Sequence, residues 1–304
     1  MRKRVLRRGL ISLARVMALG CIPVVSNLPV IEHLCHAPHL VFLLVLILGF
    51  AGFVSGMIGF GFGMVGASVL WILPPREGIP LLMLLSACSQ IFSIIQLRSS
   101  MTPVRAWWPE GPAPCILGGF LGVPIGLWVL SHLNANLTDS IIGMVIVGCA
   151  FWMILRSALA DRYPLKRTLP GALFAGLLAG TIGGLCANPG PVMVIWSNLL
   201  GLNKEQQRAV VQPFILAAQL LALLIFVIRG GVFSGCLGIL WVSSFTVILI
   251  TTRLGVMVFH RLSNLTYNRL VIILLTISGV SLFAKGWGCW NGLFAKFDHF
   301  VFSL

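Results

Sequence analysis

The residues of this chain whose types and spacing could do chemistry are glycines and prolines placed inside apolar runs. Five glycines fall within "GMIGFGFGMVG", Gly56 to Gly66, and "NPGP" occupies Asn188 to Pro191. Glycine permits a positive φ, and proline suits the first turn of a helix. The pattern predicts two broken helices, each followed by a short helix, at about residues 62–73 and 190–200. The free N–H groups at such a helix start favour an anion.

A few polar side chains could complete an anion site at these breaks. Gln90 and Gln219 stand in similar stretches, "SQIFSIIQLR" and "AQLLALLIFVIR", and an amide can donate hydrogen bonds to oxyanion oxygens. The alternatives are that each Gln bonds a neighbouring helix and that the glycines only pack helices. Packing is the favoured interpretation for the outer glycines Gly52, Gly56, Gly176 and Gly180. The candidate substrate-binding residues are Gly61, Gly63, Met64, Ser68, Gln90, Asn188, Gly190, Pro191 and Gln219.

Acidic side chains are absent from the interior of the expected spans. A cation path or a carboxylate proton relay needs such groups inside the membrane, so the expected cargo is an anion. No Walker, dinucleotide-binding or catalytic motif occurs, and we expect neither an enzyme nor a cofactor. The cysteines are interpreted as small core residues. One cluster resembles a metal site but is interpreted as a surface loop, because no second ligand cluster supports it: Glu32, His33, Cys35, His36 and His39.

The elements that must position these residues are membrane helices. Of 304 residues, 58% are hydrophobic and 9% are charged, with a mean hydropathy of +1.02. A water-soluble domain could not bury that much apolar surface. Runs long enough to span hydrocarbon, about 20 residues each, recur between Leu40 and Ala284 in helical register. The net charge of +14 lies in short clusters between these runs, which indicates orientation in the membrane and argues against a nucleic-acid partner.

An internal repeat links the two breaks. The stretch from Gly52 to Trp71 recurs at Gly176 to Trp196, about 125 residues later. The positive-inside rule places the basic linker "RSALADRYPLKRTLP" in the cytoplasm, together with loop charges that include Lys204 and Arg208. With that topology the two halves are inverted, and the two breaks converge near the midplane from opposite faces. The predicted fold class is therefore an all-α integral membrane protein of two inverted repeats, each a glycine-broken helical hairpin plus three transmembrane helices.

The predicted organisation has five parts. A basic amino-terminal extension that could hold an extra membrane helix (1–38) precedes the first transmembrane repeat (39–156). A cytoplasmic linker (157–168) leads to the second repeat (169–285), and an interfacial aromatic tail (286–304) follows. We expect a multi-pass protein of the bacterial inner membrane with a cytoplasmic amino terminus and a periplasmic carboxyl terminus. The expected partners are a small anion and the lipid bilayer, and homo-oligomerisation is left open.

The sequence resembles the TauE/SafE family of sulfite exporter-like permeases. The resemblance covers about residues 40–284 and rests on "GFVSGMIGFGFGMVGASVL", on "GTIGGLCANPGPVMVIWSNLLGLNKEQQRAV" and on the doubled hydropathy pattern. It implies a secondary transporter or facilitator for sulfite or organosulfonates. Phe60 and Phe62 make the first break bulkier than plain glycine runs, so the resemblance does not define the substrate. The alternatives are a membrane assembly or scaffold protein without transport and a metal-ion carrier that uses Cys and His.

Overall fold

The computed structural model describes the helical body of the chain. All regular structure among the described residues is helical, and no strand occurs in that part of the chain. The described residues are 38–66, 68–69, 73, 75–97, 108, 111–132, 143–144, 147–148, 151, 166–186, 189–228 and 237–286. Several predictions fall outside them: almost all of the amino-terminal extension and the aromatic tail, most of the linker and of the last helix of the first repeat, and Asn188.

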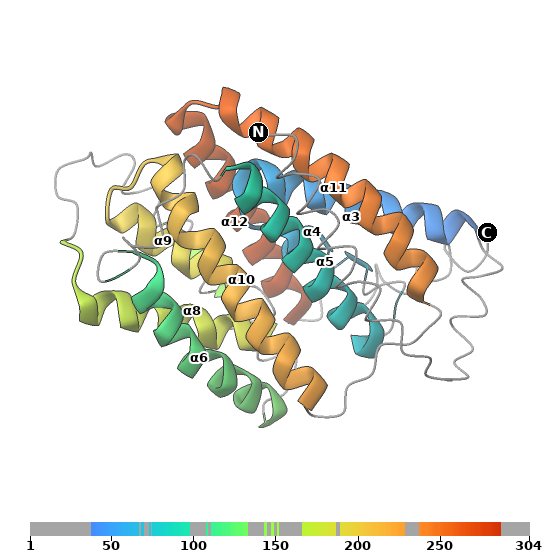
Figure 1. Ribbon diagram of the computed structural model, residues 1–304. Helices are drawn as coiled ribbons and strands as arrows, with labels where there is room; N and C mark the ends of the chain where they lie inside the picture. The colour runs from blue at the N-terminus through green and yellow to red at the C-terminus, as the bar shows by residue number, and fades with distance from the viewer. Residues whose placement is uncertain are drawn as a thin grey trace.

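The helices follow the apolar runs of the sequence, because a backbone in hydrocarbon must satisfy its own N–H and C=O groups. The first part of the chain forms α3 (Pro38–Ile58), α4 (Phe62–Gly66), α5 (Pro75–Gln96) and α6 (Ala113–His132). The second part forms α8 (Leu169–Cys186), α9 (Gly190–Leu199), α10 (Lys204–Ile228), α11 (Leu237–Arg261) and α12 (Asn264–Gly286) (Figure 1). The second short helix, α9, has the predicted length, whereas α4 is shorter than predicted.

Some of these helices have the length and composition of membrane spans. Within the described residues, two helical segments are both long enough and apolar enough to cross a membrane. They are His39–Ile58, with a mean hydropathy of 2.6, and Lys204–Ile228, with a mean hydropathy of 2.4. Shorter apolar helices cover Leu81–Gln96, Ala113–Val129 and Leu169–Leu185. Many large apolar side chains are exposed, among them Phe42, Leu121 and Ile228. Apolar surface of this extent is expected where helices contact lipid.

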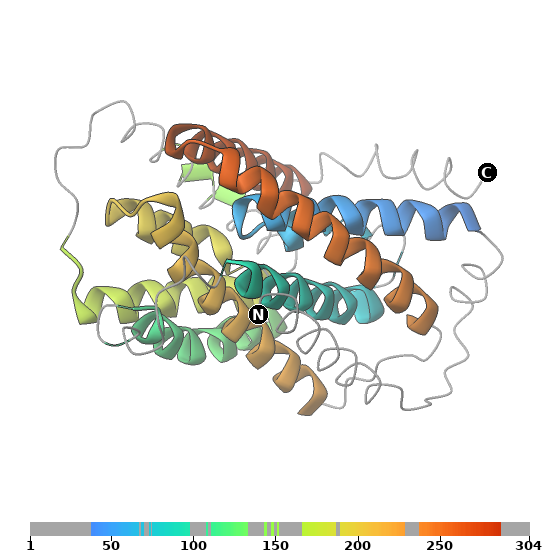
Figure 2. The ribbon, with the colours of Figure 1, turned by 45° about the horizontal axis from the view of Figure 1, so that its top comes forward.

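The long helices pack in pairs that join the two parts of the chain. α6 lies along α8, α11 lies along α3, and α5 contacts α10 between these pairs. Figures 1 and 2 show α6 and α8 on one side of the molecule and α3 and α11 on the other. Further contacts between the two parts include α10 on α6 and α11 on α5. The third long helix of each part therefore packs on the first helix of the other part.

Glycines allow the close approach of helices in the two outer pairs. A Cβ added at Gly180 of α8 would lie 2.6 Å from the Gly119 carbonyl oxygen of α6. A Cβ added at Gly52 of α3 would lie 2.7 Å from Thr251 Oγ1 of α11. The other two outer glycines face backbone atoms of the same partner helices: they are Gly56 and Gly176. Only residues without a side chain fit these contacts, so the outer glycines do pack helices.

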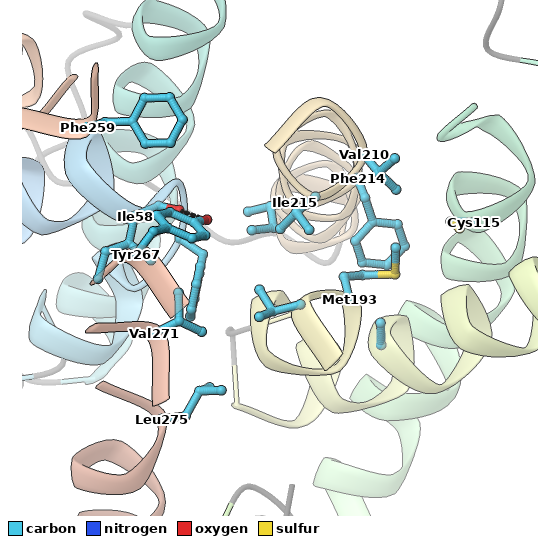
Figure 3. Packing of buried hydrophobic residues seen from close by; sticks show 14 of the residues in the cluster. Ile58, Cys115, Met193, Val210, Phe214, Ile215, Phe259, Tyr267, Val271 and Leu275 are labelled. Atoms are coloured by element: carbon cyan, nitrogen blue, oxygen red, sulfur yellow. Dashed lines mark hydrogen bonds between the residues drawn. The ribbon is translucent and has the colours of Figure 1, made fainter. Parts of the chain in front are cut away.

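The main hydrophobic core surrounds α9 and α10. Figure 3 shows Ile215 on the side of α10 that faces Ile58 and Tyr267, whereas Phe214 lies on the opposite side near Met193 of α9. All five side chains are buried. The core therefore holds the end of α3, the start of α12 and the short helix α9 against one central helix, and it fixes the surroundings of both breaks.

Candidate functional site

The first predicted break separates α3 from α4. Gly59 and Gly61 both have a φ of 93°, in the left-handed region that glycine adopts without a steric penalty. The Gly59 N–H donates to the Ser55 carbonyl at 2.8 Å, and the Val65 N–H donates to the Gly61 carbonyl at 3.1 Å. The last turn of one helix and the first turn of the next are therefore both hydrogen-bonded, and the chain changes direction only between them. Gly63 lies within α4.

The second predicted break separates α8 from α9. α8 ends at Cys186, and α9 begins at Gly190 after Pro189, whose φ is −76°. Pro189 makes no side-chain capping bond, and Pro191 in the first turn has no N–H to satisfy. The other N–H groups at the start of α9 keep the partial positive charge of a helix amino terminus. This is the local structure that the "NPGP" sequence predicts.

The two breaks meet in the interior of the protein. A Cβ added at Gly190 would lie 3.0 Å from Phe60 Cβ, 3.2 Å from Phe60 Cδ2 and 3.3 Å from Ile215 Cδ1. Phe60, Gly190 and Pro191 are all buried. The ring between the two positive-φ glycines of the first break therefore packs directly on the start of α9. The first break also joins two apolar clusters, because Phe60 belongs to the core around α10 and Phe62 belongs to a cluster formed with α3 and α5.

The two candidate glutamines lie on the central helices and are buried. Gln90 of α5 donates through Nε2 to the Gly59 carbonyl at 3.2 Å. Gln219 of α10 donates through Nε2 to Ser86 Oγ of α5 at 2.8 Å. Each Oε1 atom is buried without a hydrogen-bond partner, and each Nε2 has a second N–H that these bonds do not use. Both glutamines thus bond protein groups, as the alternative interpretation expects, and both keep unused bonding capacity.

Gln219 also lines a small cavity beside the second break. The cavity has a volume of about 10 Å³, which holds about one water molecule. A sulfur oxyanion has at least four non-hydrogen atoms and does not fit, so the protein is closed to such an anion at this place. The lining residues are Met83, Val123, Gly183, Pro189, Ala218, Gln219 and Ala222.

Arg208 is a buried charge that the sequence analysis places among the loop charges. It lies one turn into α10 and is 2% exposed. Its Nη1 donates to the Gly56 carbonyl at 3.0 Å, and its Nη2 donates to Ser93 Oγ at 2.9 Å. Gln212 donates to the same Ser93 oxygen at 3.0 Å. The guanidinium carbon lies 4.3 Å from the ring centre of Phe259.

One signal in the sequence could have identified the buried polar contacts that α10 makes with α3 and α5. Lys204, Arg208 and Gln212 recur every four residues, and Gln219 follows seven residues later. That spacing places all four on one face of a helix. Because residues 209–228 are apolar apart from Gln212 and Gln219, the polar face of this helix must turn toward protein and away from lipid.

Hydroxyl groups on α5, the other central helix, have a structural role. Ser89 Oγ of α5 donates to Ser55 Oγ of α3 at 3.3 Å and shares a 3.0 Å hydrogen bond with Thr252 Oγ1 of α11. Thr252 in turn donates to the Gly52 carbonyl at 3.2 Å. These bonds join three helices behind the first break, and they leave Ser93 as the hydroxyl of α5 that contacts Arg208.

The remaining candidate substrate-binding residues lie farther from Arg208 and the polar side chains that it contacts. Gly61 faces α12, because a Cβ there would lie 2.8 Å from Leu274 Cδ2. Met64 is half-buried at the edge of the main core, and Ser68 is half-buried in the short turn after α4. Among the described residues no hydrogen bond joins Met64 or Ser68 to either break. The structure therefore brings together the first break, Gln90, Gly190 and Pro191, with Gln219 at the neighbouring cavity.

Comparison with known protein families gave a match over most of the chain. The family model described as "Sulfite exporter TauE/SafE" matches residues 44–282. No curated protein and no solved structure matches the chain. The matched region begins in α3 and ends in α12, so it includes both breaks, the two central helices and the buried polar residues between them.

Proposed function

The chain belongs to the TauE/SafE family of sulfite exporters, and from this membership we propose that it carries sulfite or an organosulfonate across the bacterial inner membrane. The proposed protein is a secondary transporter or facilitator. Its amino terminus lies in the cytoplasm and its carboxyl terminus in the periplasm. The positive-inside distribution of Lys and Arg supports this orientation.

The contact between Phe60 and Gly190 is the observation that carries the proposal. Non-helical backbone at membrane depth is tolerated inside protein or beside a water-filled cavity. Two such segments that touch each other are expected in a transporter, where broken helices form the substrate site. Helix packing alone would not require a proline-started helix opposite a glycine break.

The buried polar groups support an anionic cargo. The side chains buried between α5 and α10 are hydroxyls, amides and one guanidinium, and no acidic side chain is buried among the described residues. Neutral donors and a positive helix end stabilise an oxyanion, whereas a cation would need carboxylates or converging carbonyls. The same composition supports the absence of a carboxylate proton relay.

We further propose that the two parts of the chain are inverted repeats that alternate access to one midplane site. The pairing of helices between the two parts supports this symmetry. A two-fold relation would make the pair α6 and α8 equivalent to the pair α11 and α3, and it would interchange α5 and α10. The matched stretches at Gly52 and Gly176 support it independently. The one-water cavity beside Gln219 then belongs to a closed conformation.

Flux measurements in proteoliposomes test the proposed transport. Purified protein is reconstituted, and uptake of labelled sulfite and of a labelled sulfonate is compared with empty liposomes. Gly190→Leu adds a four-carbon side chain where even a Cβ meets Phe60 at 3.0 Å, so we expect it to abolish uptake. Gly63→Leu tests the first break in the same way.

Gly148→Leu is the matched control, because a Cβ there has no neighbour within 4 Å. We expect this variant to transport like the unmodified protein. Size-exclusion chromatography verifies that each variant is folded before it is assayed. Absence of flux for every anion would favour the scaffold alternative, and flux that is indifferent to both Gly63→Leu and Gly190→Leu would contradict a site at the breaks.

A further inference from the structure

Arg208 is a buried cation without an anionic partner. Its hydrogen-bond acceptors are neutral: the Gly56 carbonyl and the Ser93 hydroxyl. Among the described residues the ion pair formed by α10 joins Lys204 to Glu205, and no acidic side chain pairs with Arg208. A guanidinium stays charged in proteins. Burial of an unpaired charge is costly, so a buried arginine without a carboxylate is expected where an anion arrives from outside.

The guanidinium also has an edge that is not fully used. Its Nε is buried without a hydrogen-bond partner. This atom faces Gly59, where an added Cβ would lie 2.9 Å from it. Nε–H and one N–H of Nη2 point in parallel from the same edge of a guanidinium, and that edge matches two oxygens of an oxyanion. Nη2 is occupied by Ser93, whereas Nη1, on the other side, holds the Gly56 carbonyl.

A purely structural role explains only part of this arrangement. Nη1 binds a carbonyl in the last turn of α3, at the negative end of that helix. The planar group stacks on Phe259. A neutral amide could serve that carbonyl, as Gln90 serves the Gly59 carbonyl nearby. Neither the charge nor the unused Nε is required for the structural role.

The neighbours of Arg208 form a polar line along α10. Lys204, one turn earlier, has a side chain that is 12% exposed and lies 4.9 Å from the ring centre of Phe259. Gln212, one turn later, has a buried Oε1 without a partner. Seven residues beyond it stands Gln219 at the small cavity. Arg208 is thus the buried charge on the line of polar side chains that leads from the start of α10 toward the second break.

We propose that Arg208 is the residue that binds the transported oxyanion, through its Nε and Nη2 edge, with Nη1 kept on the Gly56 carbonyl. Ser93 holds Nη2 while the site is empty and releases it when the anion binds. The inference rests on the proposed anion transport and adds the group that selects the cargo. A flat fork with two parallel donors favours a sulfite or sulfonate group over a spherical halide of equal charge.

Binding and flux measurements on three variants test this assignment. Arg208→Gln removes the charge and keeps a donor for the Gly56 carbonyl, whereas Arg208→Lys keeps the charge and loses the fork. Arg261→Gln is the matched control, since Arg261 is an exposed arginine at the end of α11. Binding of labelled sulfite to detergent-purified protein is measured with and without excess chloride, and uptake is measured in proteoliposomes.

We expect Arg208→Gln to weaken sulfite binding by about 10- to 100-fold, the range for loss of a charge-assisted contact. Arg208→Lys should raise KM and reduce the preference for sulfite over chloride. Arg261→Gln should change neither quantity. A purely structural role predicts instead a lower unfolding temperature with unchanged sulfite affinity, and that result would overturn the proposal.

Ser93→Ala tests the same idea without touching the charge. Because Nη2 loses its resting partner, we expect sulfite to bind severalfold more tightly. Unchanged or weaker binding would contradict the release of Nη2. The two levels of failure are distinguishable: normal flux in Arg208→Gln refutes only the role of this residue, whereas an unmodified protein that neither binds nor moves any anion refutes the transport function and this inference together.

Discussion

The contact between the two breaks makes a quantitative prediction for Gly190→Ala. The added methyl carbon would lie 3.0 Å from Phe60 Cβ, about 0.5 Å inside the distance at which carbon atoms pack best. Phe60 cannot turn away freely, because Gly59 and Gly61 on either side are fixed at a φ of 93°. The strain must therefore spread to α9 or to the break itself.

Two opposing effects determine the net change in stability. Overpacking of a buried site costs about 1–3 kcal/mol. Replacement of glycine by alanine in an allowed conformation stabilises by about 0.4–1 kcal/mol, because the unfolded chain loses freedom. The steric term is the larger, so we expect Gly190→Ala to lower the free energy of unfolding by about 0.5–2 kcal/mol. Thermal and denaturant unfolding of detergent-purified protein measures this change.

A double-mutant cycle with Phe60→Gly isolates the contact, because it removes both Phe60 Cβ and the ring. Their loss gives the methyl group room, so the double variant should be about 1 kcal/mol more stable than the sum of the single changes predicts. Gly66→Ala is the control, since its Cβ would lie 2.7 Å from the flexible end of Leu82 and 3.6 Å from the Phe62 ring, with no Phe60 atom among its three nearest neighbours. It should show no coupling to Phe60→Gly beyond experimental error. Additive effects of Gly190→Ala and Phe60→Gly would refute the direct contact between the breaks.

Three further changes test other parts of the structure. Gly180→Ala should destabilise α6 against α8 more than Gly190→Ala destabilises the breaks, because its Cβ would meet backbone, the Gly119 carbonyl at 2.6 Å; unfolding measurements compare the two. Gly61→Ala should cost about 1–3 kcal/mol in the same assay, since a residue with a side chain is strained at a φ of 93°. Tyr267→Phe removes the 2.7 Å bond from the tyrosine hydroxyl to the buried Ile58 carbonyl and should cost about 1–3 kcal/mol; equal unfolding midpoints would contradict that role.

The positions of the breaks could be predicted because glycine and proline act locally. A positive φ at Gly59 and Gly61 and a helix start at Gly190 follow from the properties of those residues and need no knowledge of their neighbours. The helices themselves follow from apolar runs of sufficient length for the same reason. Packing of Gly52 and Gly180 on a neighbouring helix was also expected from their spacing.

Other features depend on which helices surround a residue, and local sequence does not contain that information. Arg208 stands near a cluster of loop charges in the sequence, yet the fold packs α3, α5 and α11 around it and buries it. The repeat predicts two halves but not that each would place its third long helix on the other half. The small size of the cavity at Gln219 depends on how side chains of α5, α6, α8 and α10 pack together, which local sequence does not specify.

The packing of α11 on α3 and of α6 on α8, across the two parts of the chain, has a consequence for biosynthesis. α3 is among the first helices to be synthesised, but its partner α11 comes from much later in the chain: Thr252 and Gly52, which bond to each other, are 200 residues apart. The small-residue face of α3 must therefore stay uncovered in the membrane while most of the protein is still being translated. A nascent chain stopped after α6 would expose that face and the matching face of α6 together. Neither half is then expected to mature as an independent unit, whereas two halves synthesised in the same cell could complete each other.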